Sequence, residues 1–311
     1  MEKDSVLEMR HIYKTFPGVK ALQNVDFTLK KGEIHALMGE NGAGKSTLIK
    51  VLTGVEEFET GEIMIDGCDH AIINRSPQEA QNRGISTVYQ EVNLCPNLTV
   101  AENLFIGREP RKGGLIDWKT MNKKASKLLQ DLDIHADVTQ TIDNYSIAIQ
   151  QMIAIARAVD MSAKVLILDE PTTGLDPQTR LLIWNVIERL RTEENMTVFL
   201  TTHYMEEAAS AGYVVILDKG SIVAEGTPLE LKNEYVHDTI SLYGVTEDEI
   251  KALKTEYKEI RDGYRIQVKN TLEATKMIVK HQEIFRDYEV VKGGMDDVFL
   301  AVTGKILGGG Q

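Results

Sequence analysis

The apolar and polar positions of the first 70 residues alternate as they do in strands that are buried on one face. Val6–Met9 and Val25–Leu29 follow this alternation, and Ile63–Gly67 continues it into an Asp-Gly turn. Between them, Ile34–Met38 predicts a further strand, which a glycine-rich loop connects to a helix that ends at Gly54. The pattern therefore predicts antiparallel strands beside a strand, loop and helix unit.

The middle of the chain changes from strand periodicity to helix periodicity and back. About residues 98–160 have helical spacing, which we interpret as a helical insertion. Apolar strands return at Val165–Leu168 and Thr197–Thr201, separated by an amphipathic helix that begins after Asp176-Pro177. A hairpin is expected at Val214–Ala224. This order predicts a parallel sheet covered by helices.

The pattern changes again near residue 236. Helices are predicted at Glu247–Tyr257 and Leu272–His281, with a strand at Tyr264–Val268 between them. These short elements indicate a small appended α+β domain. Its glycine-rich end, Gly308–Gln311, is expected to be disordered.

Composition narrows the class of protein. The chain has 311 residues, 42% of them apolar, which suffices for a large core and a smaller second one. A formal charge of −12 argues against a nucleic-acid partner, since phosphate contacts require a basic surface. Apolar runs are too short to span a bilayer, and the mixed charges of Met1–Asp4 do not form a secretory signal. The expected location is the cytoplasm. Cys68 and Cys95 are interpreted as ordinary thiols.

A glycine-rich loop between a strand and a helix matches the phosphate-binding loop pattern. Its candidate nucleotide-binding residues are Gly39, Glu40, Asn41, Gly42, Ala43, Gly44, Lys45, Ser46 and Thr47. Backbone N–H groups of such a loop surround phosphates, while Lys45 would reach the β- and γ-phosphates and Ser46 would ligate Mg²⁺. The loop therefore predicts ATP and Mg²⁺ as ligands.

Polar residues follow three other predicted strands. Val165–Leu168 runs into Asp169 and Glu170, which would hold Mg²⁺ and polarise an attacking water. His203 follows the next strand and could bond the γ-phosphate, whereas Gln90 ends a strand-like stretch before the insertion. The carboxyl edge of a parallel sheet is where such folds bind ligands. Glu170, His203 and Gln90 are thus the catalytic candidates, and Ser46, Gln90 and Asp169 the metal candidates.

With Thr172–Asp176 added, the motifs resemble those of ABC ATPase domains in order and approximate spacing over about residues 5–235. The resemblance implies an α/β P-loop cassette with an antiparallel β subdomain. It places the cassette at 1–235, the helical subdomain at about 91–160 and the accessory α+β domain at 236–311.

The resemblance also implies roles and partners. Phe16, with Tyr13 as the alternative, would stack on adenine, and Asp176 would belong to a loop that signals between protomers. Two cassettes would sandwich two ATP molecules head to tail, as a homodimer or a mixed pair. Separate transmembrane subunits would hold the chain on the inner face of the cell membrane.

One motif departs from the family pattern. The signature, usually Leu-Ser-Gly-Gly-Gln, falls on Tyr145–Ile149. Ser146 is retained and could donate to the partner's γ-phosphate from a helix N-terminus. Ile147 and Ala148, however, place side chains where the family has glycine. Slow hydrolysis is one expectation, and a nucleotide-binding scaffold without turnover is an alternative.

The two halves of the cassette resemble different subfamilies. Phe16–Leu22, the phosphate loop and Val88–Glu91 resemble ribose-type sugar-importer ATPases. Thr172–Pro177 and Thr201–Ala208 are similar to drug-resistance exporter ATPases, which commonly end in a small C-terminal domain. A recombinant of two cassettes, joined near the signature helix or the Asp169 strand, is one hypothesis, and natural divergence is the other. A soluble ABC ATPase of translation or DNA repair is a further alternative, although no tandem cassette or coiled coil is visible.

Overall fold

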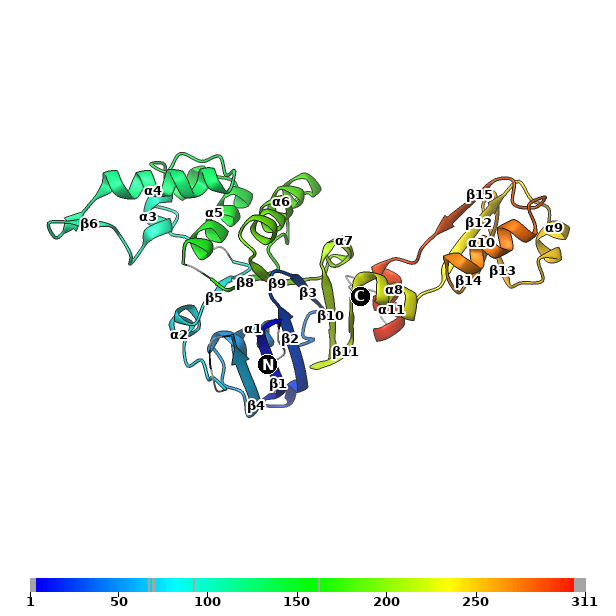
Figure 1. The fold of residues 1–311 in the computed structure, drawn as a ribbon, viewed down its shortest axis with the longest axis horizontal. Helices are drawn as coiled ribbons and strands as arrows, with labels where there is room; N and C mark the ends of the chain where they lie inside the picture. Colours follow the sequence, from blue (N-terminus) through cyan, green and yellow to red (C-terminus); the bar gives the residue numbers. More distant parts are fainter. Residues whose placement is uncertain (1–3, 67, 69–70, 92, 162, 305–311) are drawn as a thin grey trace.

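The computed structural model describes residues 4–66, 68, 71–91, 93–161 and 163–304. Figure 1 shows an elongated molecule with the helical insertion at one end, two sheets in the middle and a small antiparallel sheet at the other end. The expectations for Met1–Lys3, Gly67 and Gly308–Gln311 lie outside the described residues. None of the helices described is long and apolar enough to cross a bilayer.

A six-stranded sheet forms the centre of the molecule. Its strands, in spatial order, are β11 (Ser221–Gly226), β10 (Tyr213–Asp218), β3 (Ile34–Met38), β9 (Thr197–Thr202), β8 (Val165–Asp169) and β5 (Ile85–Val88). Every neighbouring pair is parallel except β10 and β11, which form the antiparallel hairpin. The predicted parallel sheet and its closing hairpin are confirmed.

Helices cover both faces of this sheet. They are α1 (Lys45–Thr53), α2 (Pro77–Asn82), α5 (Ile147–Asp160), α6 (Pro177–Glu193) and α7 (Met205–Ser210). Ala36 and Met38 of β3 belong to the core that also contains α5, α6 and α7, while Leu37 belongs to the core that contains α1. Alternate strand residues point to opposite faces, so the two layers of helices sandwich the sheet.

A three-stranded antiparallel sheet packs beside α1. It consists of β2 (Val19–Lys30), β1 (Ser5–Phe16) and β4 (Thr60–Ile65), in that spatial order. The ring of Phe27 on β2 lies 4.8 Å from the ring of Phe199 on β9, and this contact joins the two sheets. The predicted antiparallel segment is confirmed, and β1 is longer than the alternating run that predicted it.

The insertion is helical, as expected, but it also contains a short hairpin. Its elements are α3 (Val100–Phe105), β6 (Arg111–Lys112), β7 (Leu115–Ile116), α4 (Trp118–Asp131), the 3-10 turn η1 (Ile142–Asn144) and α5. The hairpin of β6 and β7 is exposed and projects from the end of the molecule (Figure 1). Two residues per strand are too few to show an alternating pattern, so sequence periodicity did not reveal this hairpin.

The C-terminal part has a sheet and a core of its own. After α8 (Pro228–Tyr235) come β12 (Asp238–Tyr243), α9 (Glu247–Ala252), β13 (Tyr257–Ile260), β14 (Gly263–Val268), α10 (Thr271–Lys280) and β15 (Tyr288–Val291). The strands pair antiparallel in the order β13-β14-β12-β15. The helix predicted to reach Tyr257 ends at Ala252, because Lys254 adopts a left-handed backbone (φ 51°) and Tyr257 begins a strand.

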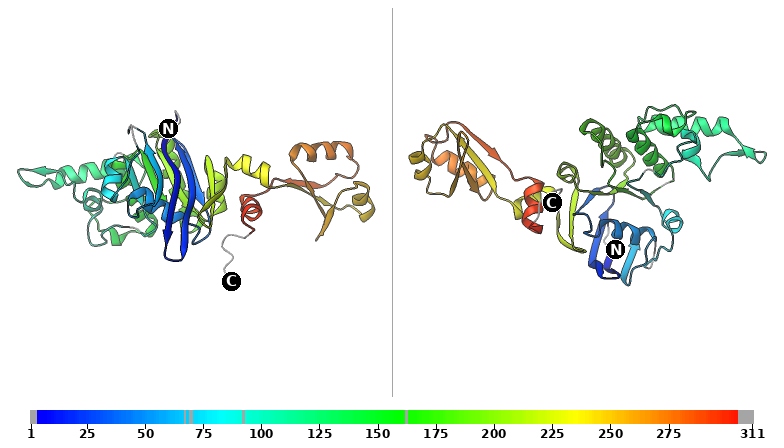
Figure 2. Two further views of the ribbon diagram at one scale, coloured as in Figure 1. Left: turned by 90° about the horizontal axis from the view of Figure 1, so that it is seen from below. Right: turned by 180° about the vertical axis from the view of Figure 1, so that it is seen from behind.

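The last helix, α11 (Met295–Thr303), leaves this small sheet and packs on the cassette. It contacts α7, α8 and β11, and Figures 1 and 2 show it beside α8 rather than beside the small sheet. Met295, Val298 and Phe299 are buried in the main core. The division at residue 236 remains a prediction, and α11 is the element beyond it that packs against the first part.

This packing predicts a stabilising role for α11. We expect Phe299→Ala to lower the free energy of unfolding of the cassette by about 3–5 kcal/mol, because it removes a large buried side chain. The matched control is Leu300→Ala, since Leu300 is 42% exposed whereas Phe299 is 1% exposed. Urea unfolding followed by tryptophan fluorescence measures the cassette, where both Trp118 and Trp184 lie. Equal midpoints for the two variants would contradict the packing.

Candidate nucleotide-binding site

A cavity of about 990 Å³ opens where β3, β8 and β9 end. It brings together residues from the antiparallel sheet, the phosphate loop, the Gln90 segment and the ends of two central strands. Its lining consists of Phe16, Val19, Ala21, Glu40, Asn41, Gly42, Gly44, Lys45, Ser46, Thr47, Gln90, Glu170, Thr173 and His203. Most of the residues predicted from the motifs therefore share one cavity.

The phosphate loop requires glycine at two positions because backbone approaches it closely. A Cβ on Gly39 would lie 2.5 Å from the carbonyl oxygen of Leu217. A Cβ on Gly44 would lie 2.5 Å from the carbonyl oxygen of Ala21, and Gly44 also has φ 113°. Gly44 is the N-cap of α1, so the first turn of this helix opens toward the cavity without a capping side chain. Free N–H groups at a helix N-terminus favour an anion there.

Lys45 is buried at the start of α1, and the loop itself holds its side chain. Its Nζ donates to the carbonyl oxygens of Gly39, at 2.7 Å, and Glu40, at 3.3 Å. The same Nζ lies 3.5 Å from Oε1 of Glu170. The cation thus lies between the loop and the acidic end of β8, where it can contact a bound phosphate.

The two acids at the end of β8 are fixed by the neighbouring strand. The Thr201 hydroxyl donates to Oδ1 of Asp169 at 2.6 Å and accepts from the Glu170 N–H at 2.9 Å. Burial raises the pKa of Asp169, and the nearby Glu170 raises it further, while the Thr201 hydrogen bond acts in the opposite direction. A carboxylate in this setting is stabilised by a cation, which is the property that a metal ligand needs.

The Glu170 carboxylate lies close to several other side chains of the site. Its backbone is left-handed (φ 47°), which is uncommon for a residue other than glycine and is often found at functional sites. Its Oε2 accepts from the Thr173 hydroxyl at 3.2 Å and lies 3.5 Å from Nδ1 of His203. Lys45, Thr173 and His203 therefore surround one carboxylate.

Five of the predicted residues are not part of this lining: Gly39, Ala43, Ser146, Asp169 and Asp176. Ser146 and Asp176 each cap a helix instead. The Ser146 hydroxyl accepts from the Ile149 N–H at 3.4 Å at the start of α5. The Asp176 carboxylate accepts from the N–H groups of Gln178 and Thr179, and a hydrogen bond from the Thr179 hydroxyl is the main reason that the pKa of Asp176 is lowered. Neither side chain is part of the lining of the cavity in its own chain.

Gly39, Ala43 and Asp169 are chain neighbours of lining residues, and Tyr13 is not part of the lining. The cavity lining also contains Val19, Ala21 and Thr173, which the motifs did not predict as site residues. Thr173 could have been found, because it follows Glu170 within the recognised motif. Val19 and Ala21 carry no chemical signal, and only the fold brings β2 to the loop.

The altered signature segment forms hydrogen bonds with residues close to it in the chain. The Tyr145 hydroxyl donates to the Asp137 carbonyl oxygen at 3.0 Å, and it accepts from the Asp137 N–H at 2.8 Å. The Gln150 side chain donates to the Tyr145 carbonyl oxygen at 2.8 Å. Ala148 is buried, whereas the Ile147 side chain is 66% exposed at the first position of α5.

The candidate metal residues offer hydroxyl, amide and carboxylate oxygens, which are the donors that Mg²⁺ prefers. Ser46 and Gln90 line the cavity, and Asp169 directly precedes its Glu170 wall. The described residues contain no cluster of three His, Cys, Asp or Glu side chains that would bind a metal on protein ligands alone. This donor set suits Mg²⁺ that is shared with phosphate oxygens.

Comparison with known proteins agrees with this geometry. Residues 22–173 match the family model described as ABC transporter. A galactofuranose transporter ATP-binding protein of Escherichia coli (strain K12) is 47% identical over 223 residues, which are 71% of this chain and 44% of that protein. A ribose import ATP-binding protein of Rubrobacter xylanophilus is 47% identical over 219 residues, which are 70% of this chain and 43% of that protein.

A solved structure supports the fold. It is a dimeric, post-hydrolysis state of an ATP-binding cassette bound to ADP and Pi, with a TM-score of 0.60 and 27% identity over 71% of this chain and 98% of that one. The predicted α/β P-loop cassette fold is confirmed.

The chain spans less than half the length of the two sugar-transport relatives. A match that covers 71% of the chain must cross the strand that ends at Asp169. The likeness to sugar-transport proteins therefore extends into the half that resembled exporters. The recombinant origin stays a hypothesis, without support from these relatives.

The cavity lining discriminates between the two candidates for adenine contact. We expect Phe16→Ala to weaken ATP binding about 10-fold, because stacking of a base on an aromatic ring contributes on the order of 1–3 kcal/mol. Tyr13→Ala is the matched control, since Tyr13 lies on the same strand but outside the cavity. Titration with a fluorescent ATP analogue measures both dissociation constants, and a larger effect of Tyr13→Ala would reverse the assignment.

Proposed function

We propose that this chain binds and hydrolyses ATP to energise transport through separate membrane subunits, because it carries an ABC transporter ATPase domain. One observation carries this proposal: Lys45, Glu170 and His203, from three different strand ends, meet in the cavity of the phosphate loop. Sugars are the proposed cargo class, since the relatives named above are galactofuranose and ribose transport proteins.

Each side chain has a proposed part in the reaction. Lys45 and the N–H groups of the loop hold the β- and γ-phosphates, and Phe16 stacks on adenine. Glu170 orients and polarises the attacking water, and His203 contacts the γ-phosphate. Ser46, Gln90 and Asp169 would hold Mg²⁺, which neutralises charge on the phosphates when bound.

The positions of Ser146 and Asp176 favour a pair of cassettes. Both lie at helix N-termini and are not part of the cavity lining of their own chain, which supports a role at a partner's nucleotide. A head-to-tail dimer would complete each site with these residues, and the related cassette bound to ADP and Pi is a dimer. The exposed Ile147 side chain supports one second candidate: a pair that binds ATP without turnover.

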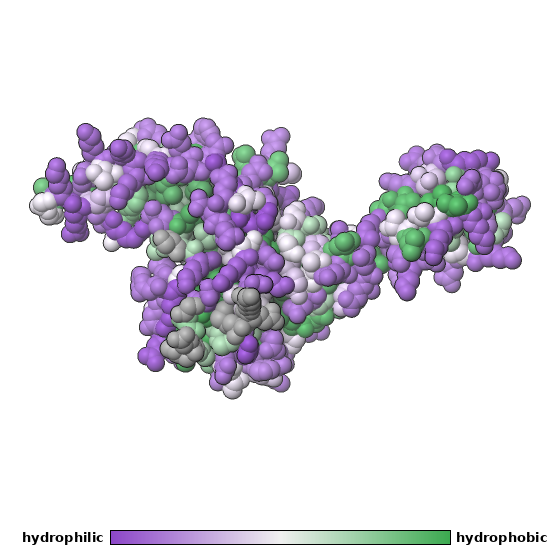
Figure 3. Space-filling view, in the orientation of Figure 1, coloured by the Kyte–Doolittle hydropathy of each residue, from purple (hydrophilic) through white to green (hydrophobic). Residues whose placement is uncertain are grey.

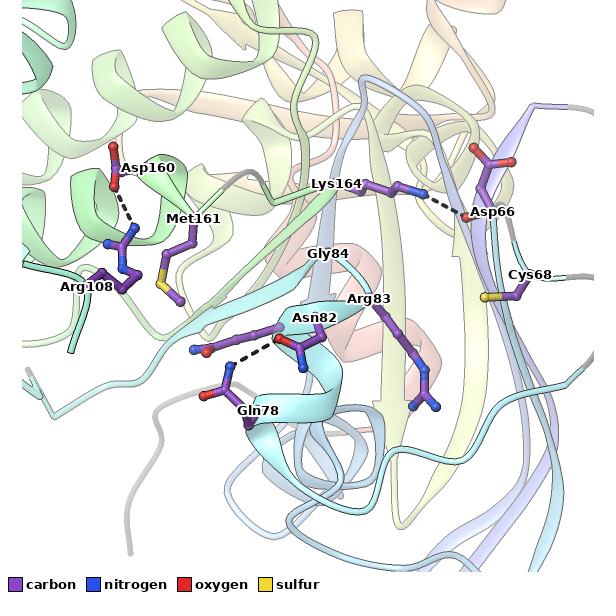
Figure 4. Close-up of a pocket in the computed structure, with 11 residues that line it drawn as sticks. Asp66, Cys68, Gln78, Asn82, Arg83, Gly84, Arg108, Asp160, Met161 and Lys164 are labelled. Carbon is purple, nitrogen blue, oxygen red and sulfur yellow. Dashed lines mark hydrogen bonds and ion pairs between the residues drawn. The ribbon is translucent and has the colours of Figure 1, made fainter. Parts of the chain in front are cut away.

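A groove between the central sheet and the helical insertion is the proposed docking site of a membrane subunit. Figure 4 shows its larger part, a pocket of about 640 Å³ between α2 and the end of α5. An adjoining pocket of about 400 Å³ shares Arg108 and Met161 with it and contains Ile106. Arg108 is fixed in the groove by an ion pair with Asp160 at 2.7 Å.

The chemistry of this groove suits a short amphipathic helix from the cytoplasmic side of a membrane protein. Ile106 is 46% exposed and supplies apolar surface to the smaller pocket, while the charged side chains of Asp160 and Lys164 line the larger one. Elsewhere the face seen in Figure 3 is largely hydrophilic, with hydrophobic patches on the C-terminal sheet domain. The proposal places the chain in the cytoplasm, at the inner face of the cell membrane.

The recombinant origin of the cassette remains a hypothesis. It is motivated by Thr201–Ala208, whose sequence is similar to that of exporter ATPases. An unmodified genomic reading frame that encodes the whole chain would overturn the recombinant hypothesis.

ATP turnover by the purified chain tests the proposed activity. We expect Mg²⁺-dependent turnover that rises faster than linearly with protein concentration, because each site needs two chains. Glu170→Gln should reduce kcat by about 100-fold or more, since it removes the carboxylate that polarises water. ATP binding by Glu170→Gln should persist. Tight binding without turnover at any concentration would instead support the scaffold.

Docking in the groove is tested by a charge at its apolar position. We expect Ile106→Glu to weaken association with the membrane subunits about 30-fold, because a buried interface position loses roughly 2 kcal/mol or more. Leu115→Glu is the control, since Leu115 is exposed on β7 outside the groove. Co-purification in detergent measures association, and ATP turnover of the isolated variants should stay normal. Equal association of both variants would contradict this docking site.

A further inference from the structure

A buried carboxylate lies behind the proposed catalytic residues and is not explained by the roles above. Glu207, on α7, is only 4% exposed. Its Oε1 accepts from the Thr172 hydroxyl and its Oε2 accepts from the Thr202 hydroxyl. Both threonines are themselves buried. Glu207 thus joins two segments that are 30 residues apart in the sequence.

These two segments carry the proposed catalytic groups. Thr172 follows Glu170 by two residues, and Thr202 directly precedes His203. On β9, the preceding Thr201 bonds to Asp169 and to the Glu170 N–H. Because successive strand residues point to opposite faces, Thr201 and Thr202 attach the end of β9 to the Glu170 turn from two sides.

His203 depends on this attachment because its own side-chain contacts are weak. Its 3.5 Å separation from Glu170 is too long for a strong hydrogen bond. Its ring lies 4.2 Å from the ring of Tyr204, which in turn lies 4.4 Å from the guanidinium of Arg180. The Thr202 hydroxyl, besides donating to Glu207, accepts from the Tyr204 N–H at 2.9 Å. The backbone from Thr202 to Tyr204 therefore sets where His203 lies.

The chemistry of Glu207 argues against a role in stability alone. Among the described residues, Glu207 has hydroxyl partners and forms no ion pair, so no opposite charge there offsets the cost of its desolvation. Apolar side chains at such a cluster would stabilise the fold at least as well. A carboxylate, however, accepts two hydrogen bonds at a fixed separation, and so it fixes two segments relative to each other.

We propose that Glu207 is a positioning residue for ATP hydrolysis, which holds the turn after Glu170 and the segment before His203 in one arrangement. This inference rests on the proposed ATPase function. Glu207 does not line the cavity, so it acts on turnover and leaves nucleotide binding intact. Positioning of catalytic groups is worth up to about 100-fold in rate for a displacement near 1 Å.

The test compares substitutions at Glu207 in the full chain. We expect Glu207→Ala to lower kcat about 10- to 100-fold with KM for ATP within about 3-fold of wild type. Glu207→Gln should restore kcat to within about 3-fold, because an amide can accept from one hydroxyl and donate to the other. Glu206→Ala is the matched control, since Glu206 is the exposed neighbour on the same turn of α7. Melting temperatures separate loss of folding from loss of rate.

The measurements distinguish failure of the positioning role from failure of the proposed ATPase function. If Glu207→Ala does not fold, Thr172→Val is measured instead, because it removes one hydroxyl without changing side-chain shape, and it should lower kcat about 3- to 10-fold. A kcat of Glu207→Ala, or of Thr172→Val in its place, equal to that of Glu206→Ala would overturn the positioning role alone. A wild-type chain without Mg²⁺-dependent turnover would overturn the proposed function, and with it the reaction that Glu207 serves.

Discussion

The parallel pairing of β3, β9 and β8 is the constraint on which the rest of the structure depends. Met38 pairs with Thr202, and Asp169 pairs with Thr201, so the three strands end at the same level. Parallel strands with aligned ends place the segments that follow them side by side. The phosphate loop, Glu170 and His203 are therefore neighbours because the strands are in register. A slip of one residue would turn each of these groups to the opposite face.

Within this frame, hydroxyl side chains determine how the charged groups lie. Thr201 bonds to Asp169 and Glu170, Thr173 bonds to Glu170, and Glu207 joins Thr172 to Thr202. Short β-branched side chains have few rotamers, so they hold their partners with little loss of conformational entropy. The left-handed backbone of Glu170 persists because these contacts surround it. Positioning around the proposed site is thus carried by threonine hydroxyls and the buried Glu207 carboxylate, while Lys45, Glu170 and His203 line the cavity.

The predicted site residues fall into two groups, those that line the cavity and those that do not. The phosphate loop, Glu170 and His203 line one cavity in a single chain, whereas Ser146 and Asp176 cap helices and are not part of its lining. At the other end, α11 packs on the cassette while the four-stranded sheet before it has its own core. The C-terminal sheet is consequently attached through two chain segments, one entering after α8 and one returning to α11. Two connections restrict the motion of a small domain more than one linker does.

The sequence by itself determined the elements whose signals are local. Three elements are predicted from a few consecutive residues each. They are the phosphate loop with its glycines and Lys45, the apolar strand before Asp169, and the helix that begins after Asp176-Pro177. Long apolar strands predicted a parallel sheet for the same reason. The helix predicted to reach Tyr257 failed because a single residue, Lys254, turns the chain after Ala252. Only the tertiary structure decided which distant residues meet: Val19 and Ala21 at the phosphate loop, Thr172 and Thr202 on Glu207, and Phe299 against the cassette. Contacts between residues far apart in the chain depend on strand order and register, which the periodicity of one segment does not contain.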